Sequence, residues 1–279
     1  MNVACHAGSR STVVRALYNR QDQGVRVDLL FDPFGVSWSD VREGAIAAEG
    51  EGFDGVWTYD HLAGSVHGQD RVLECWTTLT AIAATVPRIA VGALVLNVVN
   101  RDPGTLAVMA ATLQEVSAGR LLLGLGAGGG RDTPYAAEQQ ALGRRVQGGI
   151  ARRAAVEAAV ATLRSVWSGA VGGASGFLRP VPAPPVIIGG FGPKVAELAG
   201  RVADGINVPD GPGLARLLEV ARAARASSGR DASSLMVTVS SRLSTATLAR
   251  LDELGADRAI VFVEAPFADH VRRLASSKR

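Results

Sequence analysis

The chain has 279 residues, of which 47% are hydrophobic, and a formal net charge of +3. This length is sufficient for one large α/β domain. The sequence contains no run of about 18 apolar residues, which excludes a membrane-spanning helix. The two cysteines, Cys5 and Cys75, are too far apart in the sequence to indicate a disulfide framework or a zinc site, and they fit a cytoplasmic protein.

The positive charge is concentrated at the two ends of the sequence. Residues 1–24 carry a net charge of +2, residues 264–279 carry another +2, and the 239 residues between them therefore sum to −1. A near-neutral body is not the electrostatic pattern of a nucleic-acid-binding protein, so we expect neither nucleic-acid nor membrane partners. Residues 1–24 are expected to form a disordered or loosely docked tail, and residues 25–279 the folded domain.

From Val25 onward, the first half of the chain alternates predicted strands with predicted helices. Residues 89–96 are almost continuously apolar, which is typical of a parallel sheet covered on both faces. The helices show apolar residues at helical spacing, and two have clear N-cap residues. In order, the predicted elements are strand 25–31, helix 39–50 with Ser39 as N-cap, strand 53–58, helix 70–86, strand 89–96, helix 103–119 with Asp102 as N-cap, and strand 120–126.

A longer excursion follows before the alternation resumes. Residues 131–148 predict a polar loop or short helix, residues 150–167 a helix, and residues 168–185 an irregular crossing rich in glycine and proline. Eight strands, each followed by a helix, then predict an α/β fold of the (β/α)8 or TIM-barrel class, as a single domain with an irregular insertion after the fourth strand. The last predicted elements are strand 186–189, helix 193–203, strand 205–208, helix 212–227, strand 235–239, helix 244–254, strand 258–263 and helix 267–276.

In such a barrel, functional residues lie on the loops at the carboxyl ends of the strands. The polar and glycine-rich positions of this chain fall largely on those loops. Asp60 and His61 directly follow the second strand and are the predicted catalytic pair. The alternative is that Asp60 caps the next segment and that His61 only forms a hydrogen bond with it.

Two glycine-rich segments also follow predicted strands. Gly124, Gly126 and Gly129 match the GxGxxG pattern, but a dinucleotide site requires a helix that begins at once and an acid about 20 residues later. We therefore favour the interpretation that these glycines let a flat ring system approach the backbone. In the second segment, GGFGPK (189–194), a helix opened by Pro193 follows the glycines, which favours anion binding aided by Lys194 over an ordinary turn.

A basic cluster and a set of possible metal ligands carry less information. The cluster of Arg144, Arg145, Arg152 and Arg153 is interpreted as a solvated face, with contact to a substrate or cofactor phosphate as the alternative. His67 and Glu74 lie near His61 in the sequence, but nothing completes a ligand set, so no metal is predicted.

Five segments, in order, resemble the luciferase-like monooxygenase superfamily and, within it, the branch that uses the deazaflavin coenzyme F420. Together they cover residues 25–208, with weaker support to residue 279. The resemblance implies a TIM barrel that binds its cofactor at the C-terminal mouth, a small-molecule substrate and a homodimer. The segments are GFDGVWTYDHL, LECWTTLTAIAATVPRIAVGALVLN, RDPGTLAVMAATLQEVSAGRLLLGLGAG, RRAAVEAAVATLRSVWSG and PPVIIGGFGPKVAELAGRVADGINV.

The resemblance also implies roles for individual residues. His61 corresponds to the histidine beside the deazaflavin ring, with Asp60 next to it, and Leu94–Val95 to a non-prolyl cis peptide bond under the ring. The remaining cofactor contacts are implied to come from two groups: Asn97, Ala127, Gly128 and Gly129 at the edge of the ring, and Gly189, Gly190, Phe191 and Gly192 around the phosphate.

One position departs from the resembled family. Its sugar-phosphate dehydrogenases have a glutamate where Gly129 stands, so the general acid is left to His61 or, as weaker candidates, Tyr135 and Glu138. The resemblance implies an F420-dependent oxidoreductase, and the missing carboxylate favours a reductase that transfers hydride to a small organic substrate with an activated double bond. The alternatives are an FMN-dependent luciferase-like monooxygenase and a non-catalytic flavin-binding barrel.

Overall fold

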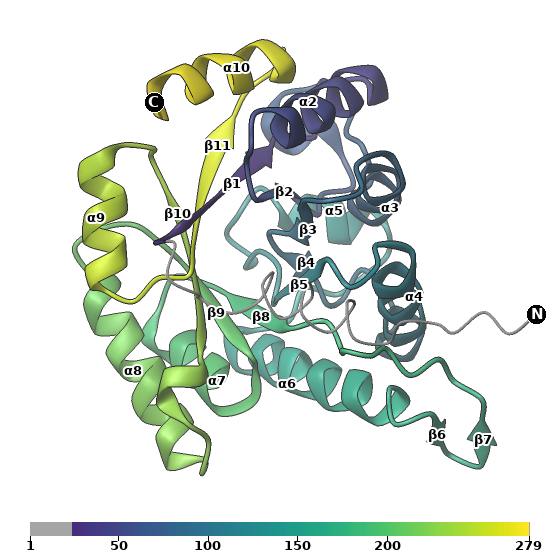
Figure 1. Cartoon of the computed structure of the whole chain (residues 1–279). Coiled ribbons are helices and arrows are strands. Elements are labelled where there is room, and N and C mark those ends of the chain that lie inside the picture. The colour runs from purple at the N-terminus through teal and green to yellow at the C-terminus, as the bar shows by residue number, and fades with distance from the viewer. Residues whose placement is uncertain (1–23, 279) are drawn as a thin grey trace, which may run out of the picture.

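Parallel strands close into a barrel in the computed structural model, which describes residues 24–278 (Figure 1). Each strand pairs in parallel with its neighbour, β1 pairs with β11, and a pairing between β3 and β5 completes the ring. The short strand β4 follows β3 and pairs with the same partner, so the two occupy one of eight strand positions. The prediction of a (β/α)8 barrel is confirmed. The strands are β1 (Arg26–Phe31), β2 (Gly55–Thr58), β3 (Ala90–Ala93), β4 (Leu96–Asn97), β5 (Leu121–Gly126), β8 (Val186–Gly189), β9 (Gly205–Pro209), β10 (Met236–Ser241) and β11 (Arg258–Val263).

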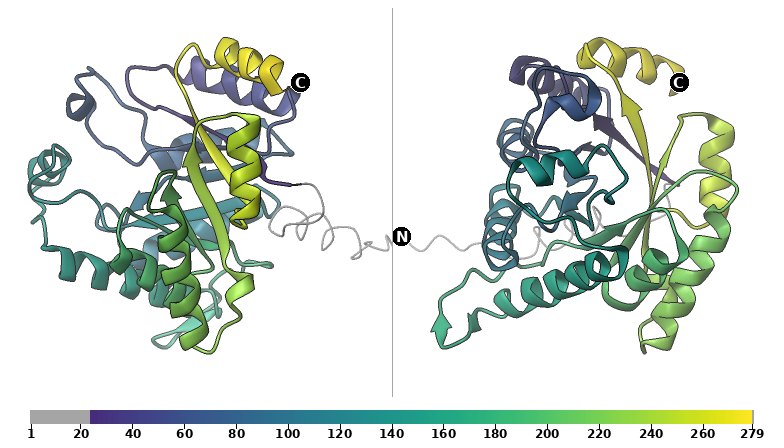
Figure 2. Two further views of the ribbon diagram at one scale, coloured as in Figure 1. Left: turned by 90° about the vertical axis from the view of Figure 1, so that its left-hand side faces the viewer. Right: turned by 180° about the vertical axis from the view of Figure 1, so that it is seen from behind.

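Helices surround the barrel. Among the described residues, the last helix, α10 (Phe267–Lys278), packs against the first, α2 (Trp38–Gly50), so that the two ends of the described fold adjoin (Figures 1 and 2). The helices that follow the eight strand positions are α2 (Trp38–Gly50), α3 (Cys75–Thr85), α4 (Pro103–Val116), α6 (Gly149–Val166), α7 (Pro193–Val202), α8 (Leu214–Ser227), α9 (Thr245–Glu253) and α10 (Phe267–Lys278). Within the described residues, three shorter helices lie in the loops: η1 (Gly64–His67), α5 (Ala136–Ala141) and η2 (Ala232–Ser234).

The strands bury apolar side chains on both faces. A large cluster fills the space between strands and helices, and a smaller one around Leu30 and Trp57 fills the barrel interior. The interior also holds an ion pair, in which Asp28 accepts hydrogen bonds from Arg258 Nε (2.7 Å) and from Trp57 Nε1 (2.8 Å). Asp28 and Arg258 are both fully buried. Because buried charges are tolerated only when paired, this network fixes the side chains on three adjacent strands.

Two predicted helix starts were wrong. The N-cap of α2 is Ser37 rather than Ser39, because Ser37 and Asp40 form a capping box in which each side chain accepts a hydrogen bond from the other residue's backbone N–H. The helix predicted to begin at Asp70 begins at Cys75. The carboxylate of Glu74 accepts the backbone N–H groups of the first helical turn, at 3.0 and 2.7 Å, and so fixes that start.

The segment predicted as one strand over 89–96 is interrupted between Ala93 and Leu96, and the Leu94–Val95 peptide bond is cis, as the resemblance implied. The predicted insertion contains α5 and α6 and then a small hairpin, β6 (Ala170–Val171) and β7 (Ala174–Ser175), which projects from the body of the barrel (Figure 2). Apart from Gly24, the predicted tail lies outside the described residues. Among residues 24–278, no helix has the length and apolar character needed to cross a membrane.

Candidate functional site

A cavity of about 570 Å³ lies at the carboxyl ends of the strands. This is the end of the barrel where the fold places its chemistry, and the volume is typical of small-molecule sites. Gly192 does not line the cavity but is the N-cap of α7. The other predicted site residues come together on the cavity wall: Asp60, His61, Leu94, Val95, Asn97, Ala127, Gly128, Gly129, Gly189, Gly190 and Phe191.

His61 is held by a carboxylate from another loop. Its Nδ1 lies 3.1 Å from Oε1 of Glu138, which comes from α5 and is buried. The same Oε1 accepts the backbone N–H groups of Leu62 (3.2 Å) and Ala63 (3.4 Å). Glu138 accepts from these backbone groups, so we assign the proton between His61 and Glu138 to Nδ1 of His61. In the neutral ring Nε2 is then the acceptor nitrogen.

Aromatic rings surround this histidine. The Tyr135 ring centroid is 4.8 Å from that of His61, and the Phe34 centroid is 5.2 Å away. Tyr59 also lines the cavity, and burial, with smaller effects from Asp32 and Tyr135, raises its pKa to about 12. The Tyr59 phenol therefore keeps its proton at neutral pH and is a hydrogen-bond donor in the cavity wall.

The Asp60 carboxylate is fully engaged by other protein groups. Its side chain is buried, and it accepts hydrogen bonds from the backbone N–H of Asn97 (2.9 Å), from Asn100 Nδ2 (3.0 Å) and from both terminal nitrogens of Arg101 (2.9 Å each). Arg101 also pairs with Glu74. This clamp ties the end of β2 to the loop after β4. The geometry therefore gives Asp60 a positioning role rather than a free carboxylate.

The glycines of two strands make room for Val95. A Cβ added to Gly126 would lie 2.4 Å from Val95 Cγ2, and one added to Gly189 would lie 2.7 Å from Val95 Cγ1. A Cβ on Gly128, which has a φ of +66°, would lie 2.5 Å from the Asn97 side chain. Protein neighbours already exclude a side chain at these three glycines, of which only Gly126 belongs to the GxGxxG pattern.

The glycine turn after β8 offers donors to an anion. Within residues 24–278, the backbone N–H groups of Phe191 and Gly192 donate to no other group, and Phe191 is 87% exposed at the cavity wall. Lys194, which the sequence suggested as a nearby cation, instead lies 3.3 Å from Glu197 with its side chain 73% exposed. The loop therefore presents backbone donors without that lysine.

Several cavity residues were missed or ranked low from sequence. Asn207 of β9 and Ser240 near the end of β10 line the cavity, and for Asn207 a polar residue in an otherwise apolar strand was the available signal. Glu138 was only a weak candidate for the acid, since nothing in the sequence shows that α5 lies against His61. Arg152 and Arg153 were interpreted as solvated, but both line the cavity.

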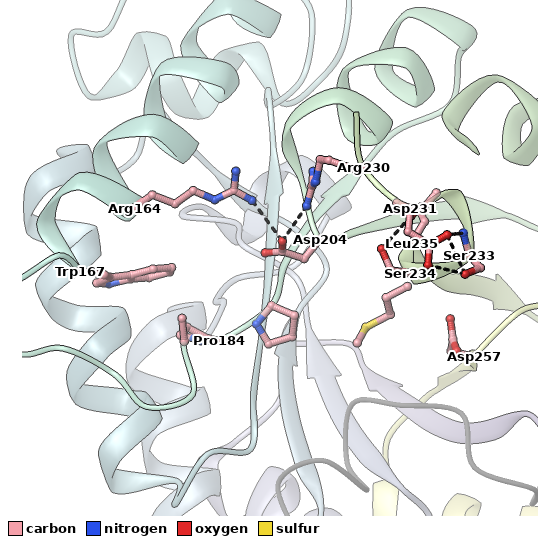
Figure 3. A pocket seen from close by; sticks show the side chains of 13 residues that line it. Arg164, Trp167, Pro184, Asp204, Arg230, Asp231, Ser233, Ser234, Leu235 and Asp257 are labelled. Carbon is pink, nitrogen blue, oxygen red and sulfur yellow. Dashed lines mark hydrogen bonds and ion pairs between the residues drawn. The ribbon is translucent and has the colours of Figure 1, made fainter. Parts of the chain in front are cut away.

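A second cavity, of about 770 Å³, lies at the opposite end of the barrel (Figure 3). Residues that directly precede β8, β9, β10 and β11 line it. Its charged groups largely satisfy one another, since Arg164 and Arg230 both pair with Asp204, each at 3.1 Å. Although it is larger, this cavity is at the amino ends of the strands, where barrel residues serve stability rather than chemistry.

Metal ligands do not gather in the part of the chain that the structure describes. No group of three or more His, Cys, Asp or Glu side chains there could hold a metal ion. His67, considered above with Glu74, instead lies against Phe34, with ring centroids 4.3 Å apart.

Comparisons with known proteins agree with this architecture. An F420-dependent glucose-6-phosphate dehydrogenase of Nakamurella multipartita is 30% identical over 184 residues, which are 62% of this chain and 52% of that protein. An F420-dependent hydroxymycolic acid dehydrogenase of Mycobacterium tuberculosis is 30% identical over 203 residues, 68% of this chain and 55% of that protein. The chain thus spans about half the length of the curated relatives it matches.

Solved structures share the fold at low sequence identity. An F420-dependent secondary alcohol dehydrogenase, in complex with an F420-acetone adduct, matches 92% of this chain and 100% of its own, with a TM-score of 0.77 and 17% identity. The F420-dependent tetrahydromethanopterin reductase of Methanopyrus kandleri matches 91% and 98%, with a TM-score of 0.72 and 14% identity. The sequence profile described as luciferase-like monooxygenase matches residues 14–271. This chain therefore belongs to the luciferase-like monooxygenase family.

Proposed function

We propose that this chain is an oxidoreductase that uses coenzyme F420 and transfers a hydride between the deazaflavin and a small organic substrate. The observation that carries the proposal is the His61–Glu138 pair on the wall of the cavity at the carboxyl ends of the strands. The F420-dependent relatives described above support the choice of cofactor.

The residues of the cavity fit such a cofactor. Its volume of about 570 Å³ suits the deazaflavin ring system. Residues 127–130 contribute backbone rather than large side chains to the wall, which leaves room for a flat ring. Asn97 would lie at the edge of the ring, and the free N–H groups of Phe191 and Gly192 would meet the phosphate. Bound F420 would supply, at C5 of the deazaflavin, the carbon that gives or takes the hydride, while the protein supplies position and polarity.

His61 would handle the proton that accompanies the hydride. With Nδ1–H directed at Glu138, the ring is fixed in orientation and Nε2 is free to exchange a proton with substrate. A carboxylate that accepts a hydrogen bond from Nδ1–H and so orients a histidine is the arrangement found in hydrolase triads. Glu138 is therefore a positioning residue for His61.

The surroundings of Gly129 favour a reductase over a sugar-phosphate dehydrogenase. A Cβ at this position would lie 2.5 Å from Thr133 Oγ1 and 2.7 Å from Tyr135 Cβ. A glutamate could not occupy it unless the loop moved. We therefore propose reduction of an activated C=C or C=N bond, with His61 as the proton donor. A homodimer and a cytoplasmic location, which the sequence suggested, are part of the same proposal.

The first test is a binding titration of the purified chain with F420 and, separately, with FMN. Micromolar or tighter binding of F420 alone is expected, followed by oxidation of reduced F420 when an unsaturated substrate is added. Preference for FMN would assign the chain to the oxygen-using enzymes, and binding of neither would refute both assignments.

The second test replaces the histidine. His61→Ala is expected to lower the rate of hydride transfer about a hundredfold or more, as for loss of a general acid, while F420 affinity changes only a few-fold. His67→Ala is the matched control, because its ring centroid is 5.7 Å from that of His61 but the residue does not line the cavity. Equal activity of His61→Ala and wild type would show that another group supplies the proton.

A further inference from the structure

The four arginines of the basic cluster do not behave alike. Arg144 donates to Asn100 (3.1 Å), and Arg145 is exposed and lies outside the wall of the main cavity. Arg152 and Arg153, the fourth and fifth residues of α6, are half-buried and line the cavity. Two guanidinium groups thus face the space in which we propose that cofactor and substrate bind.

Each of these two side chains lies against another residue of the cavity wall. Arg152 Nη1 donates to the carbonyl of Gly128, and its Nε is buried without a hydrogen-bond partner among the described residues. The Arg153 side chain folds back over the start of the helix. Its Nη1 would lie only 3.4 Å from a Cβ built on Gly149. Gly128 and Gly149 also line the cavity, so both side chains stay close to it.

No carboxylate of the described chain neutralises this pair. The two acidic residues of the cavity wall are otherwise engaged, Asp60 with Arg101 and Glu138 with His61. The N-cap of α6 is Gly148, which provides no side-chain cap, and the first turn contains no acidic residue, so the positive end of the helix adds to the same potential. A guanidinium in a partly buried site binds phosphate and carboxylate strongly, because it offers several donors in a plane.

We propose that Arg152 and Arg153 form an oxyanion subsite that binds a phosphate or carboxylate group of a molecule in the cavity. The group belongs either to the acidic tail of the cofactor or to an acidic substrate. The existence of the subsite follows from the arginines themselves, and only the identity of the bound molecule rests on the proposed function.

The test compares Arg152→Gln/Arg153→Gln with Arg145→Gln, which removes a charge of the same cluster outside the cavity. Arg153→Gln alone is the second variant, because the Arg153 side chain forms no hydrogen bond with the described residues and its loss should not disturb folding. The first readout is stabilisation of the cofactor-free protein by inorganic phosphate, measured by thermal unfolding. Wild type and Arg145→Gln are expected to bind phosphate about tenfold more tightly than the double variant.

The second readout identifies the source of the anion. F420 and the deazaflavin chromophore that lacks phosphate and tail are titrated into each variant. Weaker binding of F420 alone assigns the anion to the cofactor, and unchanged binding of both, together with lost phosphate stabilisation, assigns it to the substrate. The inference is overturned if the double variant retains wild-type affinity for phosphate and F420. It is also overturned if Arg145→Gln loses as much phosphate affinity as the double variant does. Failure of wild type to bind either deazaflavin would refute the proposed function separately, since the phosphate readout needs no cofactor.

Discussion

Replacing Asp60 by asparagine tests whether this carboxylate stabilises the fold rather than takes part in the reaction. Its two oxygens accept four hydrogen bonds of 2.9 to 3.0 Å, two of them from Arg101. Asparagine has the same size but no charge. Its NH2 group, which is a donor, would replace one of the two acceptor oxygens and would then point at a group that is itself a donor. The substitution therefore leaves at least one buried donor without a partner and weakens the pairing of Arg101.

The size of the effect follows from the burial of the pair. The Asp60 side chain is fully buried and that of Arg101 is 12% exposed. Removing one partner of a buried ion pair costs about 3–5 kcal/mol. Glu74, whose side chain is 40% exposed, would still pair with Arg101 in the variant, so the expected cost is at the low end of this range. We expect a loss of about 3 kcal/mol in the free energy of unfolding, which corresponds to a decrease in Tm of roughly 6–12 °C for a domain of this size.

Urea and thermal unfolding measure this loss, with Glu157→Gln as control. Glu157 pairs with Arg201 on the surface, where both side chains are more than 40% exposed, and its loss should cost less than about 1 kcal/mol. An Asp60→Asn variant as stable as this control would refute the clamp. If that variant also lost hydride transfer with unchanged F420 affinity, Asp60 would be a catalytic residue, as the sequence suggested.

Three further predictions follow from close contacts and caps. Gly129→Ala should destabilise the loop by about 1–3 kcal/mol, whereas Gly130→Ala, whose Cβ would meet its nearest neighbour at 3.4 Å, should match wild type in thermal unfolding. Gly124→Ala should prevent a native barrel, because its Cβ would lie 1.9 Å from the Ala93 carbonyl oxygen, and a native circular dichroism spectrum would contradict this. Burial raises the pKa of Glu74, but hydrogen bonds to its carboxylate outweigh this and lower it. Glu74→Gln should therefore be less stable than wild type at pH 7, and in urea unfolding the difference should shrink as the pH falls below about 4.5, because wild type loses the same stabilisation as the pH passes through the lowered pKa of Glu74.

The alternation of strands and helices could be read from the chain because it is a local property. Short apolar runs bounded by turn residues specify buried strands. A helix start depends on adjacent residues, as at Asp102–Pro103, and the predicted Asp102 N-cap was confirmed. The start of α3 was missed because its cap, Glu74, is a residue that sequence patterns rank low for that role. Its carboxylate is also held by Arg101, which lies 27 positions away.

The sequence by itself determined the (β/α)8 class and the rim on which polar residues gather, since eight βα units bury their apolar faces most simply as a closed barrel. Only the tertiary structure decided what each of those residues contacts. It pairs His61 with Glu138, 77 positions away, commits Asp60 to Arg101, and leaves Arg152 and Arg153 without an acidic partner in the described chain. The physical reason is that hydrogen bonds and ion pairs depend on distances of about 3 Å between groups on different loops, and these distances are set by how the strands stagger around the barrel.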